Sequence, residues 1–155
     1  MKPLALLVPF LLGSLLMAQT APPPQTETYS GMYTFLRDGE FVQITIEDEA
    51  RVTGFISRFG DGESDRGTFL DQFFKEGKLD GRNLRFTTKT VHGVSFEFKG
   101  VVERGDGKTP NDEGYHLLKG TLVENRTDAN GKTSSKSREV VFKSFPEDIG
   151  ASPHN

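Results

Sequence analysis

One acidic loop, residues 61–65, carries the side chains best suited to hold a metal ion. Its three carboxylates stand at alternate positions in a glycine-rich stretch, and calcium favours oxygen ligands in flexible loops of this kind. The EF-hand pattern is not completed, because Arg66 and Gln72 occupy the positions of its glycine and its bidentate glutamate. We therefore expect a solvated acidic loop, and the alternative is a calcium site made by Asp61, Glu63 and Asp65.

The chain lacks the residue patterns that nucleophilic or redox catalysis requires. It has no cysteine, which excludes disulfides, thiol catalysis and cysteine-ligated metals. The three histidines, His92, His116 and His154, show none of the short spacings typical of metal ligands. No serine-hydrolase motif occurs, and no glycine-rich loop opens a helix. We expect a protein that is not an enzyme and that holds no cofactor.

Composition narrows the classes of partner. The 155 residues carry 19 Lys and Arg against 22 Asp and Glu, a formal net charge of -3. Proteins that bind nucleic acid usually present a basic surface, and this balance provides none. We therefore expect a small apolar molecule or another protein as the partner, and no nucleic acid.

The elements that must position the remaining side chains are strands, because apolar residues recur at every second position. Val42, Ile44 and Ile46 alternate with polar residues. Such alternation is typical of strands with one dry face and one wet face. Eight strands are predicted on this basis, near residues 29–36, 41–47, 51–59, 68–78, 83–91, 94–103, 114–127 and 133–145.

Short breaks with turn residues separate these strands. Asp38-Gly39, Asp80-Gly81 and Asn130-Gly131 are signals for type I′ hairpins. Consecutive hairpins without a long crossover form a meander, and a meander of eight strands that closes removes its exposed edges. The predicted fold class is all-β, an eight-stranded antiparallel up-and-down barrel, and the alternative is a two-sheet β-sandwich.

Glycine recurs inside the predicted strands, at Gly54, Gly100 and Gly120, each time two residues after an apolar residue. Glycine weakens a strand, so its repetition indicates a geometric need. One interpretation is tight coiling of the sheet, and the other is room for a ligand inside the barrel.

The element Val52-Thr53-Gly54-Phe55 resembles an element of avidin-type barrels. The Asp-Gly turns and the length of the body are also similar to those of avidin-type and lipocalin-type barrels, the calycin group. This resemblance is one of architecture, covers most of residues 29–145, and implies an eight-stranded meander. No ligand residue is carried over, because avidin-type biotin sites depend on tryptophans and the chain has none. Lipocalins place a tryptophan near the first strand where Tyr33 stands here. The chain as a whole also resembles exported bacterial proteins.

An eight-stranded barrel has an interior just wide enough for packed side chains or for one small ligand. We expect a calycin-like protein that binds a small apolar molecule or a lipid in its interior. The alternative is a filled barrel that serves as a structural or protein-interaction module of the cell envelope. In both cases the interior residues are the apolar stripe Val42, Ile44, Ile46, Val52, Ile56, Leu84, Phe86, Phe96, Phe98, Leu118, Leu122 and Phe142.

A second set of phenylalanines falls on the opposite face or near the strand ends. Its members are Phe41, Phe55, Phe59, Phe69, Phe73 and Phe145. They are expected to plug the barrel ends, and the alternative is an exposed apolar patch for a partner or a second subunit.

The two ends of the chain read as an export signal and a tail. Lys2 precedes an almost wholly apolar run, residues 4–17, which is the pattern of a secretory signal peptide. We expect residues 1–18 to be that signal, with cleavage as late as residue 21 as an alternative, and a secreted or periplasmic location. Residues 19–28 would form a Pro-rich linker, 29–145 the barrel and 146–155 a flexible tail. No transmembrane segment is expected in the mature chain.

Overall fold

The computed structural model describes residues 28–146, and every strand in it falls within the predicted barrel region 29–145. The predicted signal peptide, nearly all of the linker and nearly all of the tail lie outside the described residues. No helix in the described part of the chain has the length and apolarity to cross a membrane.

Eight antiparallel strands follow one another in a single sheet, each paired with its neighbours in chain order. They are β1 (Gly31–Thr34), β2 (Phe41–Ile46), β3 (Val52–Phe59), β4 (Phe69–Asp80), β5 (Asn83–Thr88), β6 (Val94–Arg104), β7 (His116–Thr127) and β8 (Thr133–Lys143). A tight turn, η1 (Asp48–Ala50), joins β2 to β3, and Glu49 and Ala50 in it both have φ 59°. The all-β meander predicted from the alternation of apolar residues is confirmed.

The first strand is shorter than predicted, with four residues in place of the range 29–36. Phe35 continues the inward side begun by Tyr33, and beyond the last strand residue, Thr34, its ring packs against Phe96 and Phe142. Residues 69–80 form a long strand, and its bulge beside Phe74 lets the chain bend between two parts of the barrel wall.

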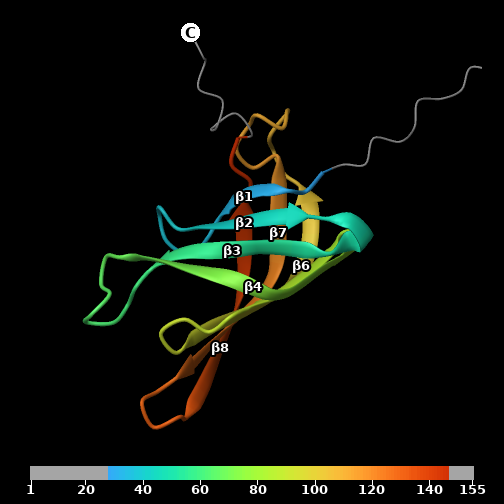
Figure 1. Ribbon diagram of the computed structural model, residues 1–155. Coiled ribbons are helices and arrows are strands. Elements are labelled where there is room, and N and C mark those ends of the chain that lie inside the picture. The colour runs from blue at the N-terminus through green and yellow to red at the C-terminus, as the bar shows by residue number, and fades with distance from the viewer. Residues whose placement is uncertain (1–27, 147–155) are drawn as a thin grey trace, which may run out of the picture.

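The sheet coils until its first and last strands meet. In Figure 1, β1–β3 cross over β7 and β8 as the sheet curls round. Tyr33 on β1 forms a bridge with Ser144, just past the end of β8, and the Phe145 amide donates to the Met32 carbonyl at 2.8 Å. Closure therefore rests on a few bonds between the short β1 and the end of β8, whereas β7 and β8 pair over eleven positions.

A chain of phenylalanine rings fills the interior. The ring of Phe74 stacks on Phe86 with centroids 4.2 Å apart, and Phe86 stacks on Phe98 at 5.3 Å. The chain continues from Phe98 to Phe142 at 5.9 Å and from Phe142 to Phe35 at 5.2 Å. Aliphatic side chains surround these rings in one core, so the barrel is held together from inside by aromatic packing.

The strand glycines serve close approach of the backbone. A β-carbon on Gly54 would lie 1.9 Å from the Gln43 carbonyl oxygen, and one on Gly120 would lie 2.5 Å from the α-carbon of Gly100. Neither position has room for a side chain, so the coiling interpretation fits these glycines and the ligand-room interpretation does not.

Replacing Gly54 by alanine is expected to destabilise the barrel by about 1–3 kcal/mol more than replacing Gly31. The two glycines share a positive φ, 150° and 151°, but nothing lies within 4 Å of a β-carbon at Gly31. The pair therefore separates steric crowding from backbone strain. Urea unfolding of G54A and G31A measures the difference, and equal losses of unfolding free energy would contradict the close-approach role.

Candidate functional site

The predicted interior residues form a packed apolar core. All of them except Ile46 are at most 2% exposed, and Ile46 is partly buried against their cluster. A ligand placed among them would have to displace rings that already contact one another. Their role as ligand contacts stays a prediction, and the core is their observed place.

One end of the barrel is different, and we call it the mouth. The β1–β2, β3–β4, β5–β6 and β7–β8 loops all lie at this end, on the left of Figure 1. Toward the mouth, the inward side of the strands changes from apolar to polar and charged. The alternation that puts Ile56 inside also puts Arg58 inside, two residues further on. The same happens on other strands, or just before them, at Glu40, Gln72, Glu124, Arg126 and Arg138.

Arg58 is the most buried cation of the mouth, with 4% of its side chain exposed. Its Nε donates to Gln72 Oε1 at 2.5 Å, and its Nη1 and Nη2 donate to the carbonyls of Phe59 and Val91 at 3.3 and 3.4 Å. A guanidinium has five N–H groups, so two have no acceptor among the described residues. Burial lowers the pKa of the Arg58 guanidinium, because the charged form is poorly solvated.

Gln72 fixes the position of Arg58 by accepting its Nε–H. Its side chain is fully buried, and its Nε2 donates to the carbonyls of Val94 at 2.8 Å and Lys89 at 3.1 Å. These bonds tie β4 to the β5–β6 turn and fix which way the Gln72 oxygen points. Gln72 is therefore a positioning residue that aims Arg58 toward the mouth.

The carboxylates near Arg58 are already engaged by other arginines. Asp61 accepts from Arg126 at 2.7 Å and from Arg37 at 3.2 Å, and its nearest oxygen is 3.9 Å from Arg58. The hydrogen bond from Arg126 lowers the pKa of Asp61. Glu40 accepts from Arg37 and from the Phe59 amide, so its charge is also satisfied. Arg58 is thus left as a cation without a carboxylate in hydrogen-bond contact.

A second guanidinium at the mouth also has an unused donor. Arg138 bonds to Glu124 through Nη2 at 3.1 Å, while its Nε is buried and without a hydrogen-bond partner in the described structure. Glu124 pairs with Arg126 as well. Apolar surface lies next to these charges, because Phe35 and Phe96 line the same depression.

The mouth contains two adjoining depressions, of about 530 and 250 Å³. They share Arg58, Asp61 and Arg126. The larger depression reaches the acidic loop and His92, and the smaller one reaches the rings of Phe35 and Phe96. This combination of a buried cation, spare N–H donors and an apolar wall suits a small molecule with an acidic group and an apolar part.

The acidic loop closes one side of the mouth. Asp65 is buried, accepts from the Gly62 amide at 2.7 Å, and lies 2.5 Å from His92 Nδ1. His92 occupies the first position of a two-residue turn with φ 49°, followed by Gly93 at φ 74°. This turn has the two positive φ values of a type I′ hairpin, and so does the β2–β3 turn, where Glu49 and Ala50 both have φ 59°. At the three predicted type I′ sites only the glycine has positive φ, so that turn type was wrong there.

The three carboxylates of the calcium alternative do not face one common point. Asp61 faces Arg126 and Arg37, Asp65 faces His92, and Glu63 is exposed. Within residues 28–146, no group of three acidic or histidine side chains lies close enough to hold a metal ion. His116 lies at the start of β7, at the end of the barrel opposite the mouth. Its ring packs edge-on against Tyr29 and Tyr115.

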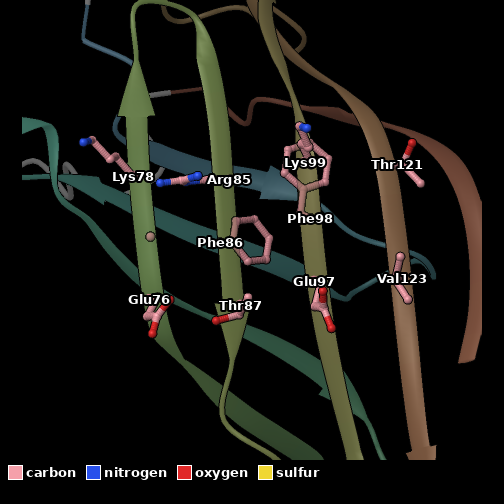
Figure 2. A pocket seen from close by; sticks show the side chains of 11 residues that line it. Glu76, Lys78, Arg85, Phe86, Thr87, Glu97, Phe98, Lys99, Thr121 and Val123 are labelled. Carbon is pink, nitrogen blue, oxygen red and sulfur yellow. The ribbon is translucent and has the colours of Figure 1, made fainter.

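A second hollow, of about 730 Å³, lies on the outer face of β4–β7. Figure 2 shows Lys78, Arg85 and Lys99 on three neighbouring strands, and the strand register places them in one row. Glu76 and Glu97 lie in the next row. These side chains are exposed and carry charges of both signs. Water screens their contacts, so an anion would be held less strongly in this hollow than at the mouth.

No protein-family model matches the chain, and no curated protein matches its sequence. Solved structures do match its fold. Rhizavidin shares 11% sequence identity at a TM-score of 0.57, over 81% of this chain and 89% of that one. Short afifavidin shares 14% sequence identity at a TM-score of 0.54, over 76% of this chain and 96% of that one. The bradavidin2–biotin complex shares 13% identity at a TM-score of 0.53, over 75% of this chain and 96% of that one. The chain therefore shares the eight-stranded barrel architecture of these avidin-type structures, as the sequence predicted.

Acid is expected to loosen the mouth. The hydrogen bond to His92 lowers the pKa of Asp65 in the folded protein, so the stability from Asp65 is present above the unfolded value, about 3.9, and is lost as pH falls through the folded value. Urea unfolding from pH 6 to pH 3 should show a declining free energy of unfolding. D65N should be less stable at pH 6 and decline less steeply.

The control is E63Q, because Glu63 lies in the same loop and is exposed. It should follow the wild-type curve. A D65N curve parallel to the wild type would contradict the role of Asp65.

Proposed function

We propose that this protein is an exported binding protein for a small molecule, which it takes at the mouth of its barrel. The ligand class is an amphipathic molecule with a carboxylate or similar acidic group. The observation that carries the proposal is Arg58, a buried cation with two N–H groups free of acceptors and no carboxylate within hydrogen-bond distance.

An acidic ligand group would supply what the Arg58 site lacks. Burying a cation whose nearest carboxylate is 3.9 Å away costs free energy, and a bidentate carboxylate restores much of it through charge-assisted hydrogen bonds. Arg138 Nε offers a further donor close by, and Phe35 and Phe96 offer apolar contact for the rest of the ligand. The acidic group would thus point toward Arg58 and the apolar part toward the two rings.

The fold supports a binding role in general terms. Three of the matching structures are biotin complexes, those of rhizavidin, short afifavidin and bradavidin2, so barrels of this architecture do bind a small molecule. At 11–13% identity the likeness extends to the fold and not to the ligand. The filled core favours the mouth over the interior that the apolar stripe first suggested.

Export rests on the first residues of the chain. Lys2 and the apolar run that follows it support a cleaved signal peptide and a secreted or periplasmic location. Binding without catalysis agrees with the lack of a nucleophile or metal motif in the sequence.

Native mass spectrometry tests this function on protein purified gently from the cells that make it. The wild type should carry an extra mass that leaves on denaturation. R58Q should lose it at least about fivefold, because a neutral side chain cannot pair with the acidic group. R138Q changes an arginine nearer the rim and should lose less of the extra mass. It tests the same site if R58Q fails to fold.

The matched control is R85Q, which removes an arginine on the outer face instead of at the mouth. It should retain the extra mass. A bare wild-type mass, or equal retention by R58Q and R85Q, would contradict ligand binding at the mouth and favour a filled structural module.

A further inference from the structure

Asp61 is the carboxylate that lies nearest to the Arg58 guanidinium, with 3.9 Å between Oδ2 and Nη1. We propose that Asp61 sets the charge of the ligand: the mouth accepts an acidic group with one negative charge and excludes a group with two. This inference rests on the proposed function, because it concerns the same ligand site. It adds the charge class of the ligand and the residue that selects it.

Six charged side chains of alternating sign form a connected chain at the mouth, in the order Glu40, Arg37, Asp61, Arg126, Glu124 and Arg138. Each is joined to the next by an ion pair, and four different loops and strands contribute them. Three are cations and three are anions, so their charges compensate one another. All six line the smaller depression together with Arg58.

Arg58 makes no hydrogen bond to this chain. Its acceptors are the Gln72 side chain and two backbone carbonyls, so its charge is not neutralised by a bonded carboxylate. Asp65 borders the larger depression, but its carboxylate accepts from the Gly62 amide and lies 2.5 Å from His92 Nδ1. The mouth therefore offers a ligand one guanidinium that has no bonded anion.

A ligand group bound to the free N–H groups of Arg58 comes to lie beside Asp61. Hydrogen bonds from Arg126 at 2.7 Å and from Arg37 at 3.2 Å hold the Asp61 carboxylate in this place. Burial lowers the pKa of Arg58, and among the charged groups that oppose this effect Asp61 acts most strongly. The two groups are thus close enough for the charge of Asp61 to reach a ligand on Arg58.

This geometry treats the first and the second negative charge of a ligand differently. Arg58 offsets the first charge through direct hydrogen bonds. A second charge on the same group has no further unbonded cation to meet, and it repels the Asp61 carboxylate a few ångströms away.

The other two carboxylates of the ionic chain are less suited to this role. Glu40 and Glu124 are buried, whereas the Asp61 side chain is 39% exposed and lies where the two depressions join. Neither glutamate forms an ion pair with Arg58 in the described part of the chain. Asp61 is therefore the residue that we assign to charge selection.

Calorimetric titration of the full mature chain with octyl sulfate and with octyl phosphate tests the inference. The two probes share their alkyl chain and the shape of their head group. At pH 8 the sulfate carries one negative charge and the phosphate about two, because the second pKa of a phosphate ester is about 6. The wild type should bind octyl sulfate about tenfold more tightly than octyl phosphate. D61N should shift this ratio at least about tenfold toward the phosphate, because Arg126 and Arg37 become free to meet the second charge.

The matched control is E63Q, which removes the same charge from an exposed position in the same loop. It should keep the wild-type ratio, and so should D61E, which retains the charge at residue 61. Partial unfolding of D61N would weaken both affinities by the same factor, so it would leave their ratio unchanged and would not imitate the expected result.

Three outcomes would overturn the inference: equal binding of the two probes by the wild type, an unchanged ratio in D61N, or a shift in E63Q as large as that in D61N. A D61N variant that binds both probes more tightly by the same factor leaves the ratio unchanged, and Asp61 would then compete for the site without selecting charge. If neither probe binds the wild type or D61N, the proposed ligand site itself is contradicted, and the inference fails with it.

Discussion

The phenylalanine rings packed inside the barrel are the constraint on which the rest of this structure depends. The chain has no cysteine and therefore no disulfide, so the interior packing must hold the sheet in its coiled form. Rings from β4, β5, β6 and β8 meet in one line and bring strands from opposite parts of the wall together. Closure between β1 and β8 is short by comparison, and Phe35 reinforces it by packing from the β1–β2 loop onto Phe96 and Phe142.

The filled interior also explains why the polar chemistry collects at one end. Inward positions near the middle of the strands must be apolar to join the ring packing. Where the strands reach the mouth, the same inward positions hold charged groups, which can be paired and partly solvated there. Arg58 is the one carried furthest inward, and Gln72 and two backbone carbonyls take only part of its hydrogen-bonding capacity. The site follows from where the core ends.

Period-two alternation predicted the strands and the interior well, because burial of one face of a strand requires an apolar residue at every second position. Val42, Ile44, Leu118 and Leu122 are in the core as expected. The mouth residues were missed, although their positions carried a signal. Arg58 and Glu124 continue the inward stripes begun by Ile56 and Leu122, and a charge on such a stripe could have been read as a site. Their pairing depends on contacts such as that between Asp61 and Arg126, 65 positions apart, which no local pattern encodes.

The turn conformations and the ends of the strands were predicted less well than the strands themselves. A glycine after aspartate or asparagine indicates a turn but does not fix the conformation of the residue before it. Only His92 adopts the left-handed conformation next to its glycine, and there the contact with Asp65 accompanies it. Strands β1 and β5 end earlier than the alternation predicted, at Thr34 and at Thr88. Just beyond these ends, the Phe35 ring packs on Phe96, and the Lys89 carbonyl accepts from the Gln72 side chain. Likeness to barrels at 11–14% identity shows that many sequences meet the same demands of packing and closure.

The central claim is that the core is full and that a ligand meets the protein at the mouth. Heteronuclear NMR during a titration with octanoate, a small amphipathic carboxylate, tests it most directly. The account predicts shift changes at the Arg58 and Arg138 side chains and at the rings of Phe35 and Phe96, with Phe86 and Phe98 unmoved. Changes centred on Phe86 and Phe98, with Arg58 unaffected, would show a ligand in the interior and contradict the account.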